Sequence, residues 1–242
     1  MISKKIHYIW LGRNQKDRLS LACINSWRRL LPDYEIIEWN ENNLPIQKIA
    51  ESNLFFRSCM KKKLWAFMSD YLRLYVLQNE GGIYLDTDVE VLKRFDDLLN
   101  NQMFLGKESG NYIGTGIIGA ERNHPIIDNL LKFYDEEIWR VNYFSNPIIF
   151  SEVLNRRLEL QSMYTVFPQD YFSPLNYKDN KIISLVGNEN TYCIHWYSGN
   201  WGMTRSGYVF LLTKQYKGTR YIIEVLRKNM GYFLRKMGLK NL

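Results

Sequence analysis

Hydrophobic and polar positions along the first two thirds of the chain follow strand-like and helix-like spacings in alternation. Strands are expected where short apolar runs end in polar residues, and helices where apolar residues recur every three to four positions without Gly or Pro. A chain of 242 residues with this pattern can form one sizeable α/β domain. The predicted strands are 5–11, 34–39, 83–85 and 103–106, and the predicted helices are 17–30, 64–79, 95–99, 124–134 and 147–157; residues 40–63 are expected to hold short helices, and the remainder to residue 202 strand and loop.

Apolar residues recur at helical spacing in the predicted helix over 64–79, which indicates that it is mostly buried. Its only charged residues are Asp70 and Arg73, which lie three positions apart and so on one face. Buried charges need a partner or a function. The two side chains either pair with each other, or Asp70 accepts hydrogen bonds from sugar hydroxyls while the rigid guanidinium of Arg73 binds phosphate or sugar oxygens.

Two carboxylates follow the predicted strand after this helix, in the stretch Gly81-Gly82-Ile83-Tyr84-Leu85-Asp86-Thr87-Asp88. Side chains two positions apart on a strand point the same way. Carboxylates directed at one point repel each other unless a cation lies between them, and oxygen ligands suit Mg²⁺ or Mn²⁺. The simplest interpretation is a metal-diphosphate site at the end of a strand. The alternative is that Asp86 and Asp88 are solvated turn residues.

Together these motifs resemble glycosyltransferase family 32, the group with a DXD-containing sugar-binding region that includes bacterial capsule and lipopolysaccharide enzymes. The glucosylating domains of large clostridial toxins share the arrangement. Ser69-Asp70-x-x-Arg73 followed by the DXD strand carries most of the resemblance, which covers about residues 4 to 202. Other similar blocks are Lys5-Ile6-His7-Tyr8-Ile9-Trp10-Leu11-Gly12, Cys23-Ile24-Asn25-Ser26-Trp27, Pro32-Asp33-Tyr34-Glu35, Ile117-Ile118-Gly119-Ala120 with His124-Pro125, Phe167-Pro168 with Tyr171-Phe172-Ser173-Pro174, and His195-Trp196-x-x-x-x-Trp201.

The resemblance implies a GT-A fold, a Rossmann-like α/β domain with a mostly parallel central sheet. It also implies a retaining transfer from a nucleotide diphosphate sugar that depends on Mn²⁺ or Mg²⁺. The catalytic residues expected on this basis are Asp70, Arg73 and Asp86, and the metal ligands are Asp88, Asp86 and His195. The expected donor-binding residues are Ile9, Trp10 (against the nucleobase), Ser69, Asp70, Arg73, Tyr84, Asp86, Ser198 and Trp201.

Several of these positions have an alternative role. Trp10 could be a core residue instead of a stacking platform for a base. His195 follows a short apolar run and could present its imidazole to a metal at a strand end, although a lone histidine is more often structural. The stretch Gly114-Thr115-Gly116 could let the backbone approach the sugar or could be a plain turn. Where the family has Thr-Gly-Pro and Asn-Ala, this chain has Ser145-Asn146-Pro147 and Thr115-Gly116, both expected near the acceptor.

The last forty residues are strongly basic. Residues 203–242 carry nine Lys or Arg and one acid, a net charge of +8 against +7 for the whole chain. Apolar residues lie between the basic ones, as in helices that bind anionic membrane surfaces. The alternative is a helix pair that packs on the domain with a solvated basic face. We expect a GT-A domain over 1–202 and a basic amphipathic helical tail over 203–242, with no nucleic-acid binding.

Composition points to a cytoplasmic protein, peripheral on the inner face of the membrane if the tail binds lipid. No apolar run is long enough for a transmembrane helix, and the N-terminus lacks a signal-peptide core. The three cysteines, Cys23, Cys59 and Cys193, are typical of reduced core residues. The expected function is transfer of a hexose, with UDP-hexose as the favoured donor, to a glycan or lipid-linked acceptor in surface polysaccharide synthesis.

Two other functions compete with this interpretation. In a haloacid-dehalogenase-like phosphatase, Asp86 would be the nucleophile and Asp88 the acid/base. That motif usually has Thr or Val where this chain has Glu90, and it gives the pair Asp70 and Arg73 no role. A non-catalytic sugar-binding protein would be expected to have lost Asp88 or Arg73, and both are present.

Overall fold

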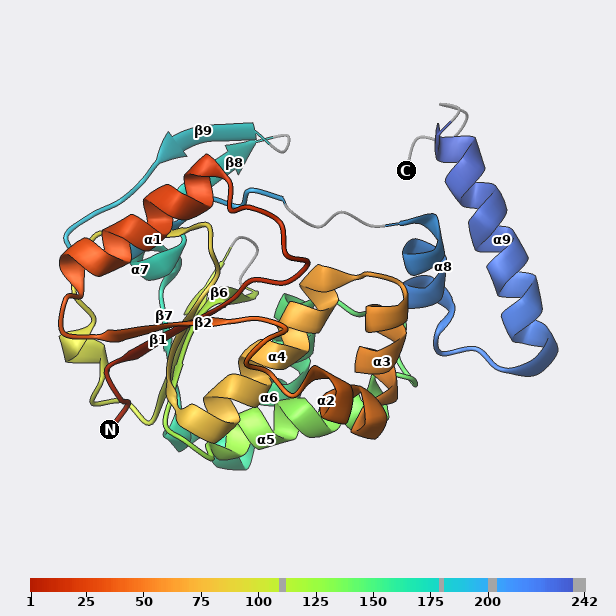
Figure 1. The fold of residues 1–242 in the computed structure, drawn as a ribbon, viewed down its shortest axis with the longest axis horizontal. Helices are drawn as coiled ribbons and strands as arrows, with labels where there is room; N and C mark the ends of the chain where they lie inside the picture. Colours follow the sequence, from red (N-terminus) through yellow and green to blue (C-terminus); the bar gives the residue numbers. More distant parts are fainter. Residues whose placement is uncertain (109–111, 179–180, 200–203, 237–242) are drawn as a thin grey trace.

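A six-stranded sheet crosses the centre of the protein in the order β2-β1-β3-β6-β5-β7 (Figure 1). The computed structural model describes residues 1–108, 112–178, 181–199 and 204–236. Within them, β6 pairs antiparallel with both of its neighbours and the other pairings are parallel, so the predicted mostly parallel α/β sheet is confirmed. The strands are β1 (Lys5–Ile9), β2 (Glu35–Trp39), β3 (Gly82–Leu85), β5 (Met103–Lys107), β6 (Ile113–Ala120) and β7 (Thr165–Phe167).

Helices cover both faces of this sheet (Figure 1). Because side chains alternate along β1, Ile6 and Tyr8 pack beneath α1 (Arg18–Leu30) in one hydrophobic core, whereas Ile9 belongs to the core on the opposite face. That second core is built around α4 (Trp65–Glu80), the predicted buried helix. The other helices on its side are α2 (Ile46–Ser52), α3 (Leu54–Lys61), α5 (Pro125–Lys132) with the π-helical turn Phe133–Glu137, and α6 (Asn146–Arg156).

The double glycine between α4 and β3 is a geometric requirement. Both residues have positive φ, +63° at Gly81 and +102° at Gly82, where side chains are strained. A Cβ on Gly82 would lie 2.9 Å from Nε2 of His7, and one on Gly81 would lie 2.7 Å from the backbone nitrogen of Arg122. Only glycine therefore lets the chain turn sharply from the helix into the strand that carries the DXD motif.

The glycine-rich stretch 114–119 lies in the middle of a strand, so its interpretation as a plain turn was wrong. All eight residues of β6 are buried between β3 and β5. Its glycines make room for aromatic rings: a Cβ on Gly119 would lie 2.0 Å from the ring of Phe104. The glycines of this segment disfavour a strand, and packing against β3 and β5 on its two sides therefore holds it in the sheet.

Short elements complete the C-terminal half of the domain. β4 (Val89–Val91) pairs antiparallel with β10 (Cys193–His195), which joins the residues after the DXD motif to a strand about a hundred positions later. As predicted, strands and loops account for most of this region, with short helices added. The other elements are η1 (Asp96–Leu98), η4 (Leu158–Met163), α7 (Gln169–Phe172), and the hairpin of β8 (Leu175–Lys178) and β9 (Lys181–Leu185).

The two tail helices differ in their contacts. α8 (Arg205–Thr213) packs on the domain: Leu211 is fully buried, and the ring of Phe210 lies 6.1 Å from that of Phe55. Just after α8, the amine of Lys214 donates to the carbonyl oxygens of Val141 and Tyr143. α9 (Gly218–Lys236) contacts α8 and otherwise stands away from the body (Figure 1). The division of the chain at residue 202 stays a prediction.

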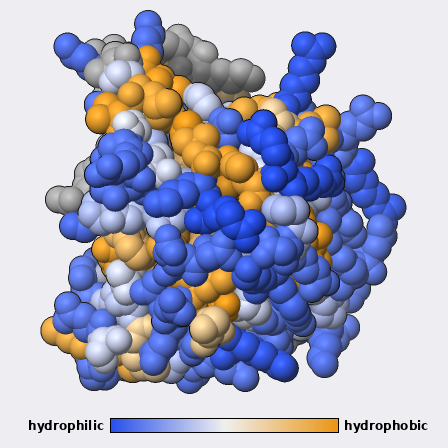
Figure 2. Space-filling model, turned by 90° about the vertical axis from the view of Figure 1, so that its left-hand side faces the viewer, coloured by the Kyte–Doolittle hydropathy of each residue, from blue (hydrophilic) through white to orange (hydrophobic). Residues whose placement is uncertain are grey.

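The surface of the described residues is mainly hydrophilic on the face that carries α1 and the β8–β9 hairpin, with a band of hydrophobic residues crossing it (Figure 2). On the hairpin and just after it, Ile182, Leu185 and Val186 are about half exposed. Among the described helices, none is long and apolar enough to cross a membrane.

Candidate active site

A cleft of about 650 Å³ lies at the edge of the sheet where β1 and β3 end. Parallel strands in α/β sheets place ligand sites at this edge. Most of the residues predicted for the site line the cleft, although they are spread over nearly 190 positions of the chain. Those from the prediction are Ile9, Trp10, Ser69, Arg73, Tyr84, Asp86, Asp88, His195 and Ser198, and they are joined by Asn14, Trp65, Glu108, Thr115, Pro147 and Tyr197.

The three predicted metal ligands converge in this cleft. One ligand atom from each of Asp86, Asp88 and His195 lies within 4.8 Å of the others. The antiparallel pairing of β4 with β10 produces this convergence, because it sets His195 opposite Val89, the residue next to Asp88. Two carboxylates and an imidazole at such separations form a candidate site for a divalent cation.

Asp88 is held as an ionised carboxylate. Burial opposes ionisation, but the imidazole of His195, with Nε2 3.3 Å from Oδ1, and the backbone N–H of Ser198, 2.8 Å from Oδ2, hold the pKa of this carboxyl well below its usual range. The Asp88 carboxylate in turn raises the pKa of His195 against the opposing effect of burial. The negative charge that a cation would need is therefore present at neutral pH.

Arg73 organises the floor of the cleft. Its side chain is only 4% exposed, and Nη2 lies 2.9 Å from Oδ1 of Asp70 and 3.2 Å from Oδ1 of Asp86. Nη1 donates to the carbonyl oxygen of Thr115 over 2.6 Å. Tyr84 adds a hydrogen bond from its hydroxyl to Oδ1 of Asp86 at 2.8 Å. The Arg73 guanidinium and the Tyr84 hydroxyl thus set the orientation of Asp86. Its side chain therefore has less rotational freedom to lose when a ligand binds.

Asp70 lies beneath the cleft and does not line it. Oδ1 accepts hydrogen bonds from Arg73 and, over 2.9 Å, from the side-chain amide of Asn146. Its other oxygen is buried and has no hydrogen-bond partner among the described residues. Burial raises the pKa of Asp70 to about 7, against the attraction of Arg73. In this structure Asp70 pairs with Arg73, which is the first of the two alternatives that the sequence left open. Asn146, expected near the acceptor, is fully buried and bridges Asp70 to the hydroxyl of Tyr134.

Trp10 directly follows β1, which lies on the side of β3 away from β6 and β5. Its indole N–H donates to the carbonyl oxygen of Asn14, and the ring is partly exposed rather than in the core. Ile9 is buried beside it. Ser69, on α4, has its hydroxyl 3.4 Å from that of Tyr84. Trp201, the remaining predicted donor-binding residue, lies outside the described residues.

Sequence reasoning missed Glu108, and Tyr197 was not among the predicted site residues; both line the cleft, with the Tyr197 hydroxyl 3.4 Å from Oε2 of Glu108. Glu108 directly follows β5, so the sequence offered only a single carboxylate after a predicted strand. No second chemically active residue nearby in the sequence marked it as part of a site. The Tyr197 ring stacks on His195 with centroids 4.0 Å apart.

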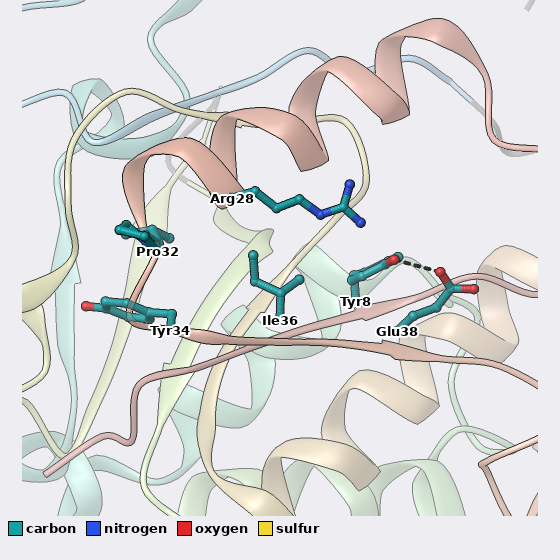
Figure 3. A pocket seen from close by; sticks show the side chains of 7 residues that line it. Tyr8, Arg28, Pro32, Tyr34, Ile36 and Glu38 are labelled. Atoms are coloured by element: carbon teal, nitrogen blue, oxygen red, sulfur yellow. Dashed lines mark hydrogen bonds between the residues drawn. The ribbon is translucent and has the colours of Figure 1, made fainter.

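A second cavity, of about 550 Å³, lies between α1 and β2, away from the DXD motif (Figure 3). Arg28 reaches over it from α1, while Tyr8 and Glu38 come from the sheet and are hydrogen-bonded to each other over 2.6 Å. The amine of Lys16 also bonds Glu38. Because the carboxylate is already satisfied by these neighbours, this cavity lacks the converging ligand atoms of the first.

Comparisons with known proteins find a matching family model, similar sequences and similar folds. Residues 17–105 match the family model described as a glycosyltransferase sugar-binding region containing DXD motif. The chain is 26% identical over 160 residues to inositol phosphoceramide mannosyltransferase 3 of Schizosaccharomyces pombe, covering 62% of this chain and 44% of that protein. It is 29% identical over 116 residues to the human alpha-1,4-N-acetylglucosaminyltransferase, covering 46% of this chain and 29% of that protein. The chain thus spans less than half the length of these relatives.

Two solved structures share the fold. The glycosyltransferase PaToxG matches with a TM-score of 0.54 at 20% identity, covering 66% of this chain and 70% of that one. The UDP-bound glycosyltransferase domain of the YGT toxin matches with a TM-score of 0.55 at 10% identity, covering 98% of this chain and 90% of that one. The expected GT-A fold is therefore confirmed, and the family model and the relatives confirm the resemblance to DXD-containing glycosyltransferases.

Proposed function

We propose that this chain, which carries the DXD sugar-binding region of glycosyltransferases, moves a hexose from a nucleotide diphosphate sugar to a glycan or lipid-linked acceptor in surface polysaccharide synthesis. The observation that carries the proposal is the convergence of Asp86, Asp88 and His195 on one point of the cleft floor. Such a cluster can bind a cation, and a cation can bind a diphosphate.

The donor set fits a divalent metal. Two carboxylate oxygens suit Mg²⁺ and Mn²⁺, and the imidazole nitrogen of His195 favours Mn²⁺ over Mg²⁺. Asp88 and His195 would bind the ion, with Asp86 beside them. When bound, the metal would stabilise the negative charge that develops on the departing nucleotide diphosphate.

The protein's own groups would hold the donor and the reacting bond. Trp10 would pack against the nucleobase, and Ser198 and Trp201 would lie near the diphosphate. Arg73 and Tyr84 would keep Asp86 in place, while Asp70 neutralises Arg73 from below. We favour UDP-hexose as donor, with GDP-mannose as the alternative that the mannosyltransferase relatives suggest.

Retention of configuration is part of the proposal and rests on the family resemblance. The acceptor hydroxyl would attack from the face that the diphosphate leaves, and an oxygen of the leaving phosphate would take its proton. Asp70 is too deeply buried to act as a nucleophile, with a side chain only 1% exposed. Asp70, Arg73 and Asp86 would therefore serve by binding and electrostatics.

The phosphatase alternative is not favoured. A phosphatase with Asp86 as its nucleophile would give the buried pair of Asp70 and Arg73 no role. The family match and the relatives also belong to glycosyltransferases. The non-catalytic alternative lacks support because Arg73 and Asp88 are both in place.

A thermal-shift screen tests the proposal. UDP, GDP, CMP and their sugar conjugates would each be added with Mn²⁺, with Mg²⁺ and with a chelator. We expect a metal-dependent rise in Tm with one nucleotide family, and Asp88→Asn should remove that rise and metal-dependent turnover while the protein stays folded. A rise that survives the chelator, or normal turnover in Asp88→Asn, would refute the metal assignment.

We further propose that α9 brings the enzyme to an anionic membrane surface, where a lipid-linked acceptor would be found. One face of α9 exposes Ile222, Ile223, Leu226, Met230 and Phe233, each at least 45% accessible. Its basic residues include Arg220, Arg227 and Lys228, and its single acid, Glu224, pairs with Arg227. An apolar stripe beside excess positive charge suits the headgroup region of anionic lipids.

Co-sedimentation with vesicles tests the membrane proposal. The chain should be ended after Lys217, because α8 packs into the domain and its removal would expose the core. We expect the full chain to bind phosphatidylglycerol-containing vesicles and the shortened chain to be released, with each basic residue contributing on the order of 1 kcal/mol. Leu226→Asp in the full chain should weaken binding without loss of the fold. Equal binding of both chains, or binding to purely zwitterionic vesicles, would overturn the proposal.

A further inference from the structure

The strand order of the sheet arranges the cleft residues in a line. Trp10 follows β1, Asp86 follows β3, and Glu108 follows β5, with β6 between β3 and β5. Adjacent strands lie about 4.8 Å apart, so Trp10 is roughly one strand spacing to one side of Asp86 and Glu108 roughly two to the other. Since β6 runs antiparallel, its first residues lie at the same edge and form the floor between Asp86 and Glu108.

If a nucleotide sugar binds along this line of residues, the expected roles of Trp10 and of the carboxylate-imidazole cluster fix which end of the cleft holds the sugar. With the base at Trp10 and the diphosphate at the carboxylate-imidazole cluster, the hexose falls over the start of β6 and reaches Glu108. The floor there is low, because Gly114 and Gly116 carry no side chains. A Cβ on Gly116 would lie 2.9 Å from Cε1 of His195, so a larger residue would displace that imidazole.

Glu108 is built into the wall at this end. The carboxyl group lines the cleft, and burial raises its pKa against the attraction of His195. Its backbone N–H donates to the carbonyl oxygen of Tyr112, which fixes the residue at the end of β5. Among the described residues, the hydrogen bond to its side chain comes from the hydroxyl of Tyr197, at a long 3.4 Å. Among the described residues the carboxyl group therefore keeps acceptor capacity for a further partner, and Glu108 lines the cleft.

We propose that Glu108, positioned by Tyr197, binds the hydroxyl groups of the transferred hexose and contributes to the choice of donor sugar. This inference rests on the proposed function, since it assigns the sugar end of the same cleft. A carboxylate suits the task because it accepts hydrogen bonds from two neighbouring hydroxyls, and a hydroxyl left unpaired in a buried site is costly. Tyr197 acts on the sugar through Glu108 and is a positioning residue.

Calorimetric titration separates the sugar from the nucleotide. Wild-type protein, Glu108→Gln and the control Glu51→Gln, an exposed residue of α2, would be titrated in Mn²⁺ with UDP, UDP-glucose, UDP-galactose, their N-acetylated forms, GDP and GDP-mannose. We expect Glu108→Gln to leave nucleotide diphosphate affinity unchanged and to weaken the preferred nucleotide sugar roughly tenfold to hundredfold, the range for a hydrogen bond to a charged group. Glu51→Gln should match the wild type with every ligand.

Tyr197→Phe tests the positioning role, because it keeps the ring on His195 and removes the hydroxyl. Its loss of sugar affinity should be smaller than that of Glu108→Gln, and the double variant should bind no more weakly than Glu108→Gln alone, since both changes act through one contact. Additive losses would overturn the positioning role.

The outcomes also distinguish this inference from the function on which it rests. If the wild type binds no nucleotide diphosphate with Mn²⁺, the proposed function fails. If the wild type binds nucleotide sugars and Glu108→Gln binds them equally well, the function stands and the assignment of Glu108 is overturned. The assignment of Glu108 to the donor sugar would also be overturned if Glu108→Gln raised only the KM for the acceptor, because the carboxyl group would then bind the acceptor.

Discussion

Acidification should destabilise this protein through His7, a buried residue of β1. The ring is inaccessible to solvent, with Nε2 2.7 Å from the carbonyl oxygen of Gly81 and Nδ1 accepting the indole N–H of Trp39 over 3.0 Å. This arrangement fixes a neutral imidazole in which Nε2 carries the hydrogen. A second proton on Nδ1 would face the Trp39 donor, and burial lowers the pKa of His7 to about 4.

The size of the effect follows from linkage. The pKa falls from an ordinary value of 6.5 to about 4, and each unit corresponds to about 1.4 kcal/mol. The unfolded chain binds the proton first as the pH drops, so the stability from neutral His7 is complete above pH 6.5, is lost between pH 6.5 and 4, and does not change further below. The expected loss is about 3 kcal/mol, a large part of the 5–15 kcal/mol typical of a domain.

Urea unfolding of the wild type and His7→Gln, at pH 7, 6, 5 and 4, measures this loss. Glutamine can donate to the carbonyl oxygen of Gly81 but does not titrate, so the variant should not lose stability through this position on acidification. We expect the variant to be less stable than the wild type at pH 7, and the difference in their free energies of unfolding should shift by about 3 kcal/mol in favour of the variant by pH 4. Other titrating groups, His124 and His195 among them, are present in both proteins and cancel in the difference. A gap that stays constant over this range, or an NMR titration of His7 near pH 6.5, would refute the reasoning.

Three further substitutions, the first with a matched control, test the packing and the site. Gly119→Ala should destabilise the domain by about 1–3 kcal/mol in urea unfolding because its Cβ would meet the Phe104 ring, whereas Gly231→Ala on α9, with nothing within 4 Å, should be neutral or stabilising. Tyr84→Phe should lower kcat/KM about tenfold by freeing Asp86, with an unchanged circular dichroism spectrum; an unaltered rate would exclude that positioning role. Lys214→Met should lower the free energy of unfolding by about 1–3 kcal/mol and increase hydrogen exchange in α8, because two carbonyl oxygens lose their donor. Unaltered exchange would show that Lys214 does not hold α8 on the domain.

Elements defined by local pattern were predicted closely from the sequence. The helix expected at 17–30 is 18–30, and the one expected at 64–79 is 65–80, because neither contains Gly or Pro and both show strong apolar spacing. β6 was not expected as a strand. Three glycines interrupt the strand formers of its sequence, Ile-Gly-Thr-Gly-Ile-Ile-Gly-Ala. The segment is held by two neighbouring strands and by the rings next to Gly116 and Gly119, none of which is local information.

The site divides in the same way. Asp86 and Asp88 were identifiable because both carboxylates follow one strand within three positions. His195 came only from the family resemblance, since its approach depends on the pairing of β10 with β4. Glu108 was missed because a single carboxylate after a strand gives no signal until the fold shows what it faces. The depth of Asp70 also needed the structure, which adds Asn146 as a buried partner.

The pairing of β4 with β10 ties the candidate metal site of Asp86, Asp88 and His195 to the loop that borders the cleft. β4 begins one residue after Asp88, and β10 ends at His195, so one ladder positions both ligands. The loop after β10 is fastened to the same strand: the backbone N–H of Trp196 donates to the carbonyl oxygen of Asp88, and its indole N–H donates to Glu90 over 3.1 Å. The N–H of Ser198 then reaches the Asp88 carboxylate itself. A change in this loop would therefore move both candidate ligands, Asp88 and His195. If the proposed function holds, substitutions at Trp196 should alter metal affinity and nucleotide affinity together rather than one alone.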